Sequence, residues 1–125
     1  MNVIIFGPPG AGKGTQAINI VNKFNLHQVS TGDLLRNEIK NKTELGRQIE
    51  QIINRGDFVT DDIVSNLLEK ILTKSLYRNK IIFDGYPRNI NQAKSLELML
   101  KDDNQSIDHV LYLKVNKKTI EKRIL

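Results

Sequence analysis

A short apolar run followed by a glycine-rich turn and a lysine constrains the fold more than any other part of the chain. Residues 3–15 read Val-Ile-Ile-Phe-Gly-Pro-Pro-Gly-Ala-Gly-Lys-Gly-Thr. The apolar run predicts a buried strand, and the glycines predict a tight turn that opens a helix. Backbone N–H groups and a lysine at such a helix start bind phosphate. We therefore expect a nucleotide phosphate chain to contact Gly10, Ala11, Gly12, Lys13, Gly14 and Thr15.

The loop departs from the full phosphate-binding pattern at one position. Residues 7–13 match G-x-x-x-x-G-K, but Gly14 stands where the pattern places a Ser or Thr for magnesium, and Thr15 follows it. A glycine turn in an unrelated α/β protein is the alternative interpretation. We expect Lys13 to contact the β- and γ-phosphates, whereas Thr15 either touches a phosphate or caps the helix.

Strand-like and helix-like segments alternate along the rest of the chain. Apolar segments predict further strands around Val29, at residues 81–83 and at residues 109–115. Apolar spacing and capping residues predict helices after Lys13, at 34–40, at 45–54, from Thr60 onward, from Asn89 to about Lys101, and after Asn116. This alternation predicts an α/β fold in which helices cover both faces of a parallel sheet.

Composition narrows the class of protein. The 125 residues contain no cysteine, which excludes disulfides and thiolate metal sites and fits a cytoplasmic location. No apolar run approaches the roughly 20 residues that span a bilayer. The net charge of +5 comes from 19 basic and 14 acidic residues, and the lysines are scattered. We therefore expect a solvated surface, with neither a nucleic acid nor a membrane as a partner.

A second group of chemistry-bearing residues follows the apolar segment 81–83. Asp84 ends that segment, where an acid can face the glycine loop and hold magnesium directly or through water. Gly85 permits close approach of the backbone, and Pro87 stiffens the turn. Arg88 then projects from a strand end, where it suits bidentate phosphate binding. The alternatives are an ordinary acidic turn and a surface arginine.

Three motifs in register resemble those of the adenylate kinases. They are the loop at 7–15, Ser-Thr-Gly-Asp-Leu-Leu-Arg at 30–36, and Asp-Gly-Tyr-Pro-Arg at 84–88 with Gln92. The resemblance covers all 125 residues. It implies a P-loop NTPase fold with three α/β/α layers and the parallel strand order 2-3-1-4, a fifth strand being missing. It also implies a core domain at residues 1–29 and 60–125 and a small helical monophosphate-binding subdomain at residues 30–59.

The resemblance implies the reaction ATP + AMP ⇌ 2 ADP, with magnesium as the cofactor. It assigns to AMP the residues Thr31 and Arg36, the backbone of Asp57, Phe58 and Val59, and the residues Gly85, Tyr86, Pro87, Arg88 and Gln92. Gln92 is expected to read the adenine edge, because an amide pairs with adenine's donor and acceptor. Asn89 and Gln92 also fit a capping box, which is the structural alternative.

For ATP, the resemblance adds Arg123 to the glycine loop, as the residue that stacks on the adenine. It places magnesium near Asp84 and Asp33, held through water. Phosphoryl transfer between two nucleotides needs neutralisation and alignment of two polyanions, and no covalent nucleophile. The expected catalytic residues are therefore Lys13, Arg36, Arg88 and Arg123.

Complete members of that family continue past the point matched by Leu125, with a lid over ATP. Neither the lid nor its arginines lie in these 125 residues, so we expect a truncated chain. Such a chain would bind nucleotides, turn over weakly because water is not excluded, and self-associate through exposed apolar surface. A full-length enzyme would be a monomer.

Other functions stay open at this point. UMP/CMP kinases share the glycine loop and the D-G-[FY]-P-R segment, but they usually carry Ala where Thr31 stands and Asn where Gln92 stands. Both positions here favour AMP. A nucleotide-binding fragment without catalysis and a basic nucleic-acid-binding domain are the remaining alternatives.

Overall fold

Strands and helices alternate along the chain, as the sequence pattern predicts. The computed structural model describes residues 1–8 and 10–114. Within them, the strands are β1 (Val3–Phe6), β2 (His27–Ser30), β3 (Ile81–Asp84) and β4 (His109–Tyr112). The helices are α1 (Lys13–Phe24), α2 (Thr31–Lys40), α3 (Glu44–Asn54), α4 (Asp61–Leu72), the short 3-10 helix η1 (Ser75–Tyr77) and α5 (Ile90–Asp102). No helix in this part of the chain is both long and apolar enough to cross a membrane.

The last described strand is shorter than the sequence pattern predicts. The strand predicted over residues 109–115 ends at Tyr112, although Leu113 still donates a backbone hydrogen bond of 2.9 Å to Phe6. Val115, the helix predicted after Asn116, and Arg123 lie outside the described residues.

The strands form one parallel sheet in the order β2-β3-β1-β4, which confirms the expected order. Asp84 of β3 is in register with Ser30 of β2 and with Ile5 of β1. The carboxyl ends of these strands therefore meet at one edge of the sheet. Open parallel sheets bind ligands at this edge, so the segments that follow β1, β2 and β3 converge where a site is expected.

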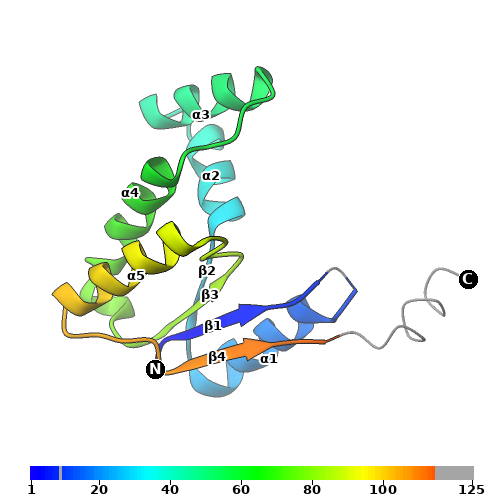
Figure 1. The fold of residues 1–125 in the computed structure, drawn as a ribbon, viewed down its shortest axis with the longest axis vertical. Helices are drawn as coiled ribbons and strands as arrows, with labels where there is room; N and C mark the ends of the chain where they lie inside the picture. Colours follow the sequence, from blue (N-terminus) through cyan, green and yellow to red (C-terminus); the bar gives the residue numbers. More distant parts are fainter. Residues whose placement is uncertain (9, 115–125) are drawn as a thin grey trace, which may run out of the picture.

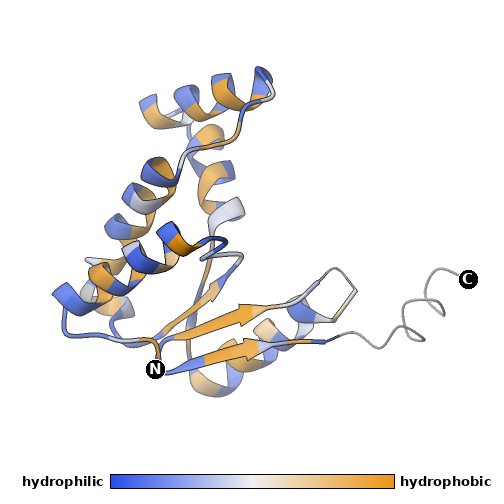
Figure 2. Cartoon of the chain, viewed as in Figure 1, coloured by the Kyte–Doolittle hydropathy of each residue, from blue (hydrophilic) through white to orange (hydrophobic). Residues whose placement is uncertain are grey.

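Helices cover both faces of the sheet, which confirms the predicted layered architecture (Figure 1). On one face, Ala17 of α1 packs with Val3, Ile5 and Ile82. On the other face, side chains of α4 and α5 pack on the alternate strand residues, including Ile4, Val29, Ile81 and Phe83. Figure 2 shows β1 and β4 as hydrophobic along most of their length, whereas the helices carry mixed surfaces. Burial on both faces explains why β1 and β3 are continuously apolar rather than alternating, whereas β4 is mostly exposed.

Helices α2 and α3, which we call the helical arm (residues 31–54), extend away from the sheet edge (Figure 1). They approach each other closely at Gly46, where a Cβ atom would come within 2.0 Å of the Glu38 carbonyl oxygen. Thr43 caps α3 by accepting a 2.9 Å hydrogen bond from the Gly46 N–H. Only glycine therefore permits this helix contact.

Helix α2 begins three residues earlier than the sequence pattern indicates. It starts at Thr31 rather than at Leu34, directly after the extended residue Ser30. Asp33 lies in the first turn, where a carboxylate stabilises a helix N-terminus through the helix dipole. The acid in this polar segment makes it a favourable helix start.

Candidate active site

The glycine loop turns from β1 into α1 by means of two left-handed backbone positions. Gly10 has φ of 86° and Gly12 has φ of 79°, a region that side chains other than glycine rarely adopt. Ala11 donates a 3.2 Å hydrogen bond to the Pro8 carbonyl, which closes the turn. Gly12 stands at the N-cap of α1 and no side-chain hydrogen bond caps this helix. The first turn of α1 thus presents backbone donors at the sheet edge, as phosphate binding requires.

Lys13 and Asp84 form an ion pair beside this loop. Their side chains are 29% and 14% exposed, so the pair is partly shielded from water. Gln28 of β2 donates a 3.2 Å hydrogen bond to the other carboxylate oxygen of Asp84. The pairing of Lys13 with Asp84 joins the glycine loop to the end of β3, as the motif interpretation requires.

Lys13 lines a pocket of about 340 Å³ at this edge, which we call the loop pocket. Its other lining residues are Ile5, Phe6, Gly7, Gly85, Pro87 and Arg88. The pocket is therefore bounded by β1, by the start of α1 and by the turn after β3. Two positive side chains, Lys13 and Arg88, line it, which suits a polyanionic ligand.

A second pocket of about 430 Å³, the arm pocket, lies between the helical arm, α4 and the turn after β3. It brings together six residues predicted for the monophosphate site, Thr31, Phe58, Val59, Gly85, Arg88 and Gln92. Its lining also includes Gly32 and Leu35 of the 30–36 motif, Asn89 of the predicted capping box, and Asp61 and Val64 of α4, for which no role in the site was predicted. Asp61 and Val64 reach the pocket because α4 packs beside it, and no local motif predicts that packing.

Arg88 and Gly85 line both pockets and form the boundary between them. The Arg88 Nε donates a 2.8 Å hydrogen bond to the Gly85 carbonyl, and the Thr31 hydroxyl donates to the same oxygen at 3.4 Å. The Arg88 backbone N–H donates to Gln92 Oε1 at 2.7 Å. This turn is thus held from three sides, which keeps the guanidinium group between the two pockets.

Four residues predicted for the monophosphate site do not line the arm pocket. Arg36 is exposed and pairs with Asp33 one helical turn earlier. Asp57 pairs with Arg55 at 3.7 Å. Tyr86 is buried and donates a 3.0 Å hydrogen bond to the Gln92 carbonyl, whereas Pro87 lines the loop pocket instead.

The environment of Tyr86 shifts its acidity. Burial raises the pKa of the Tyr86 hydroxyl above its ordinary value, and the nearby charge of Asp61 raises it further, whereas a hydrogen bond with Ser65 lowers it. Tyr86 is therefore a neutral packing residue that supports the turn carrying Arg88.

A family model described as adenylate kinase matches residues 5–125. The chain belongs to the adenylate kinase family. This confirms the family resemblance found in the three motifs.

Curated adenylate kinases resemble the chain over nearly its whole length. The adenylate kinase of Pelagibacter ubique (strain HTCC1062) is 58% identical over 125 residues, which is 100% of this chain and 59% of that protein. That of Mycoplasma mycoides is 49% identical over 124 residues, 99% of this chain and 57% of the relative. That of Thermosipho africanus is 40% identical over 124 residues, 99% of this chain and 58% of the relative. The chain thus spans somewhat more than half the length of these adenylate kinases.

The sheet edge offers one carboxylate, that of Asp84, to the magnesium expected for an adenylate kinase. Magnesium in nucleotide sites is held by one or two carboxylates together with phosphate oxygens and water. Asp84 supplies one such carboxylate beside Lys13 and the glycine loop, whereas Asp33 is paired with Arg36. Among residues 1–8 and 10–114, no group of three or more acidic or histidine side chains could hold a metal by itself. The site therefore fits a metal that arrives with a phosphate chain.

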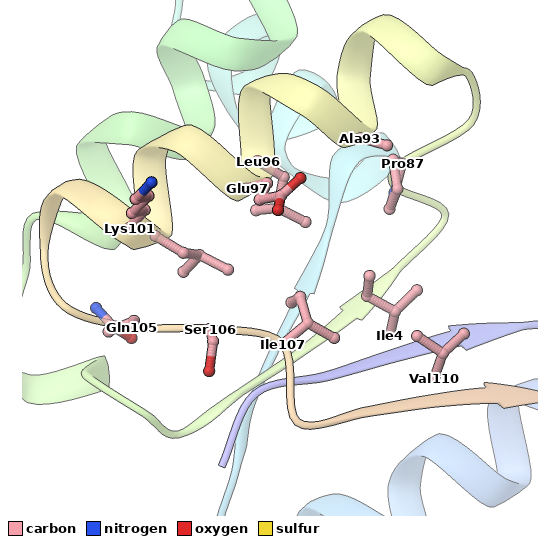
Figure 3. Close-up of a pocket in the computed structure, with 11 residues that line it drawn as sticks. Ile4, Pro87, Ala93, Leu96, Glu97, Lys101, Gln105, Ser106, Ile107 and Val110 are labelled. Atoms are coloured by element: carbon pink, nitrogen blue, oxygen red, sulfur yellow. The ribbon is translucent and has the colours of Figure 1, made fainter.

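A third pocket, of about 430 Å³, lies under α5 and contains none of the strand-end charged groups (Figure 3). Figure 3 shows Leu96 and Ala93 of α5 facing Ile107 of the following loop, with Ile4 and Val110 of the sheet below them. Its lining is mainly aliphatic, and its charged side chains are Glu97 and Lys101 of α5. The loop and arm pockets, which both include Arg88 in their lining, are therefore the stronger candidates for a functional site.

Proposed function

We propose that this protein catalyses the reversible, magnesium-dependent transfer of the γ-phosphoryl group of ATP to AMP, giving two ADP. One observation carries the proposal. Arg88 and Gly85 line both the loop pocket and the arm pocket, so two nucleotides bound there would present their phosphates to the same turn. Such an arrangement suits direct transfer between nucleotides, because positioning supplies much of the rate enhancement.

The loop pocket is proposed to hold the phosphates of ATP. The backbone N–H groups of the glycine loop and the Lys13 ammonium group would contact the β- and γ-phosphates. Asp84, with Asp33 as a further candidate, would hold magnesium through water. When bound, magnesium would neutralise phosphate charge that builds up during transfer. Lys13 is paired with Asp84 in the structure. A bound phosphate chain would replace the Asp84 carboxylate as the partner of the Lys13 ammonium group.

The arm pocket is proposed to hold AMP. Thr31, Phe58, Val59 and Gln92 line the space expected for the adenosine part, and Arg88 would bind the phosphate. Arg36, which extends from α2 beside Gly32, would reach the same phosphate after leaving Asp33. The backbone of Asp57 remains a proposed neighbour of the base.

The 125 residues alone are proposed to bind both nucleotides but to transfer phosphoryl groups slowly. Arginines that clamp a migrating phosphoryl group contribute about 10³- to 10⁵-fold to the rate in related reactions. The lid arginines expected from the family resemblance do not lie in these 125 residues. The proposed arginines are Arg36, Arg88 and Arg123, and the last lies outside the described residues. We further propose a cytoplasmic, nucleotide-handling enzyme without a nucleic-acid partner, in keeping with the scattered charge and the absence of cysteine.

An ADP-formation assay with different acceptors tests the proposal. The chain, and a longer form that continues into the part of its relatives it does not span, would each receive magnesium and ATP with AMP, UMP, CMP or GMP. We expect turnover with AMP alone, and faster turnover in the longer form. Turnover with UMP above that with AMP would overturn the assignment of Thr31 and Gln92. Nucleotide binding with no transfer in either form would overturn the proposed reaction.

A further inference from the structure

Both polar atoms of the Gln92 side-chain amide are held by the protein. Gln92 is 8% exposed and lines the arm pocket. Its Oε1 accepts a 2.7 Å hydrogen bond from the Arg88 backbone N–H. Its Nε2 donates a 2.8 Å hydrogen bond to Asp61 Oδ1. The amide therefore spans two fixed partners on opposite sides.

These two partners permit only one orientation of the amide. A backbone N–H can only donate, and an ionised carboxylate can only accept. Turning the amide over would place its NH₂ group against the Arg88 N–H and its carbonyl oxygen against the Asp61 carboxylate. Two good hydrogen bonds would become two repulsive contacts at a nearly buried position, which is costly.

Asp61 is itself held in place. It lies in the first turn of α4, directly after the N-cap residue Thr60. The Asn89 side chain donates to both oxygens of its carboxylate, at 3.3 Å and 3.4 Å. Asn89 also caps α5 by accepting a 2.8 Å hydrogen bond from the Gln92 backbone N–H. The carboxylate therefore sits between two helix starts and cannot follow a turned amide without losing contacts.

We propose that Asp61 is a specificity-determining positioning residue, which fixes the Gln92 amide so that the site accepts 6-aminopurine and rejects 6-oxopurine monophosphates. The inference rests on the proposed AMP site. With its present partners, Oε1 keeps one free lone pair and Nε2 keeps one free hydrogen. Adenine has an amino group at position 6 that donates to an oxygen and a ring nitrogen that accepts. Hypoxanthine has a carbonyl group at position 6 and a ring N–H, which is the opposite pattern.

A free glutamine could serve either base by turning its amide over, and Asp61 removes that freedom. AMP would bind with the amide as it stands, whereas IMP would force the unfavourable orientation or leave polar groups unpaired. The loss of such a contact costs IMP about tenfold or more in affinity relative to AMP. Gln92 would contact the base, and Asp61 would fix the orientation of the Gln92 amide that makes this contact.

Asp61→Asn tests this role in the full 125-residue chain. An asparagine at this position can accept a hydrogen bond from Gln92 Nε2 or donate one to a turned Gln92 Oε1, so the turned amide keeps one repulsive contact, at the Arg88 N–H, instead of two. Dissociation constants for AMP and IMP would be measured by calorimetry. Asp62→Asn is the matched control, because it removes the same charge from the same helix turn, and no described hydrogen bond joins Asp62 to Gln92.

The expected result is that Asp61→Asn lowers the preference for AMP over IMP by about tenfold, mainly through tighter IMP binding, because the turned amide no longer faces two repulsive partners. Asp62→Asn should leave the preference unchanged. Equal weakening of AMP and IMP in Asp61→Asn would show a merely supporting role and overturn the proposal, as would an unchanged preference. In a Gln92→Leu background, Asp61→Asn should no longer alter the preference.

A measurement on the unaltered chain keeps the proposal testable if Asp61→Asn fails to fold. Scalar coupling across the hydrogen bond between Gln92 Nε2 and the Asp61 carboxylate can be followed by NMR. We expect the coupling to persist in the AMP complex. Loss of the coupling on addition of AMP would overturn the proposed lock. Failure of the unaltered chain to bind AMP at all would instead contradict the proposed function, so the two failures are distinguishable.

Discussion

The sheet edge and the helical arm each carry an ion pair between residues predicted for the site, and the two pairs differ sharply. Lys13 and Asp84 join α1 to β3 across the sheet edge, with side chains 29% and 14% exposed. Asp33 and Arg36 lie one turn apart on α2 and are 67% and 71% exposed. The first pair lines or adjoins the loop pocket, whereas Arg36 lies outside the arm pocket.

This difference shows how position in the fold decides what a motif residue can do before a ligand arrives. Parallel register brings the ends of β1, β2 and β3 together, so the Lys13–Asp84 contact is set by the core. The Asp33–Arg36 contact needs only the local spacing of one helix, and such exposed pairs contribute little to stability. We therefore expect the sheet edge to be ready for phosphate and the arm to adjust when AMP binds.

Lys13→Met should produce the largest effect. Loss of a lysine that makes charge-assisted hydrogen bonds to phosphate is expected to weaken ATP binding by about 100-fold. AMP binding in the arm pocket should change far less, because Lys13 does not line that pocket. Calorimetric titration with each nucleotide measures both effects. Lys23→Met, in the last turn of the same helix, is the control, and an equal loss in that variant would contradict the role of Lys13.

Gly46→Ala should destabilise the helical arm and leave the sheet edge unchanged. The added methyl group would meet the Glu38 carbonyl oxygen at 2.0 Å, so α2 and α3 must move apart. We expect a local loss of about 2 kcal/mol in the stability of the arm. Amide hydrogen exchange should accelerate in α2 and α3 but not in β1 or β3, and AMP affinity should fall more than ATP affinity. Gln48→Ala on the exposed side of α3 is the control, and unchanged exchange in Gly46→Ala would refute the close contact.

Part of this comparison was predictable from the sequence, because it depends on local pattern. The strand and turn at residues 3–15 and the helix starts at Thr60 and Asn89 follow from apolar runs and capping side chains, and Thr60 and Asn89 do cap α4 and α5. The confirmed strand order came from the family resemblance of three motifs in register. Motifs that identify a family also predict its strand order, which composition and periodicity cannot predict.

The remaining features depend on contacts between distant segments. Gln28 reaches Asp84 across 56 residues of sequence, and Asp61 reaches Gln92 across 31. Neither residue belongs to a recognisable motif, so no local signal marks it. The requirement for glycine at position 46 has no local signal either, because it arises only when α2 packs on α3.

Arg36→Ala tests the exposed ion pair of the helical arm. We expect a change of less than about 0.5 kcal/mol in the free energy of unfolding, because the lost ion pair is exposed. AMP affinity should nevertheless fall by about tenfold, since the guanidinium group would no longer reach the phosphate. Urea unfolding and calorimetry on the same protein measure the two quantities. A stability loss larger than the binding loss would mean that Arg36 supports the arm rather than the ligand.

His27 gives the smallest expected effect and lies away from both pockets, at the start of β2. Burial lowers the pKa of His27, the charge of Lys74 lowers it further, and its ring stacks on Tyr77 at 3.9 Å. Because its folded-state pKa lies below the unfolded value of 6.5, its contribution to stability is complete above that pH and is lost as the pH falls below it. His27→Gln should therefore lose less stability than the unaltered chain between pH 7.5 and pH 5. Urea unfolding at both pH values measures this, and equal losses would exclude the contribution.

We propose that the loop pocket and the arm pocket bind two nucleotides at once and meet at Arg88 without overlapping. Calorimetric titration of AMP into the chain, with magnesium and a saturating non-hydrolysable ATP analogue already present, tests this claim most directly. We expect AMP still to bind with one-to-one stoichiometry and with an affinity within a few-fold of the value without the analogue. Displacement of AMP by the analogue, with affinity falling in proportion to analogue concentration, would contradict it.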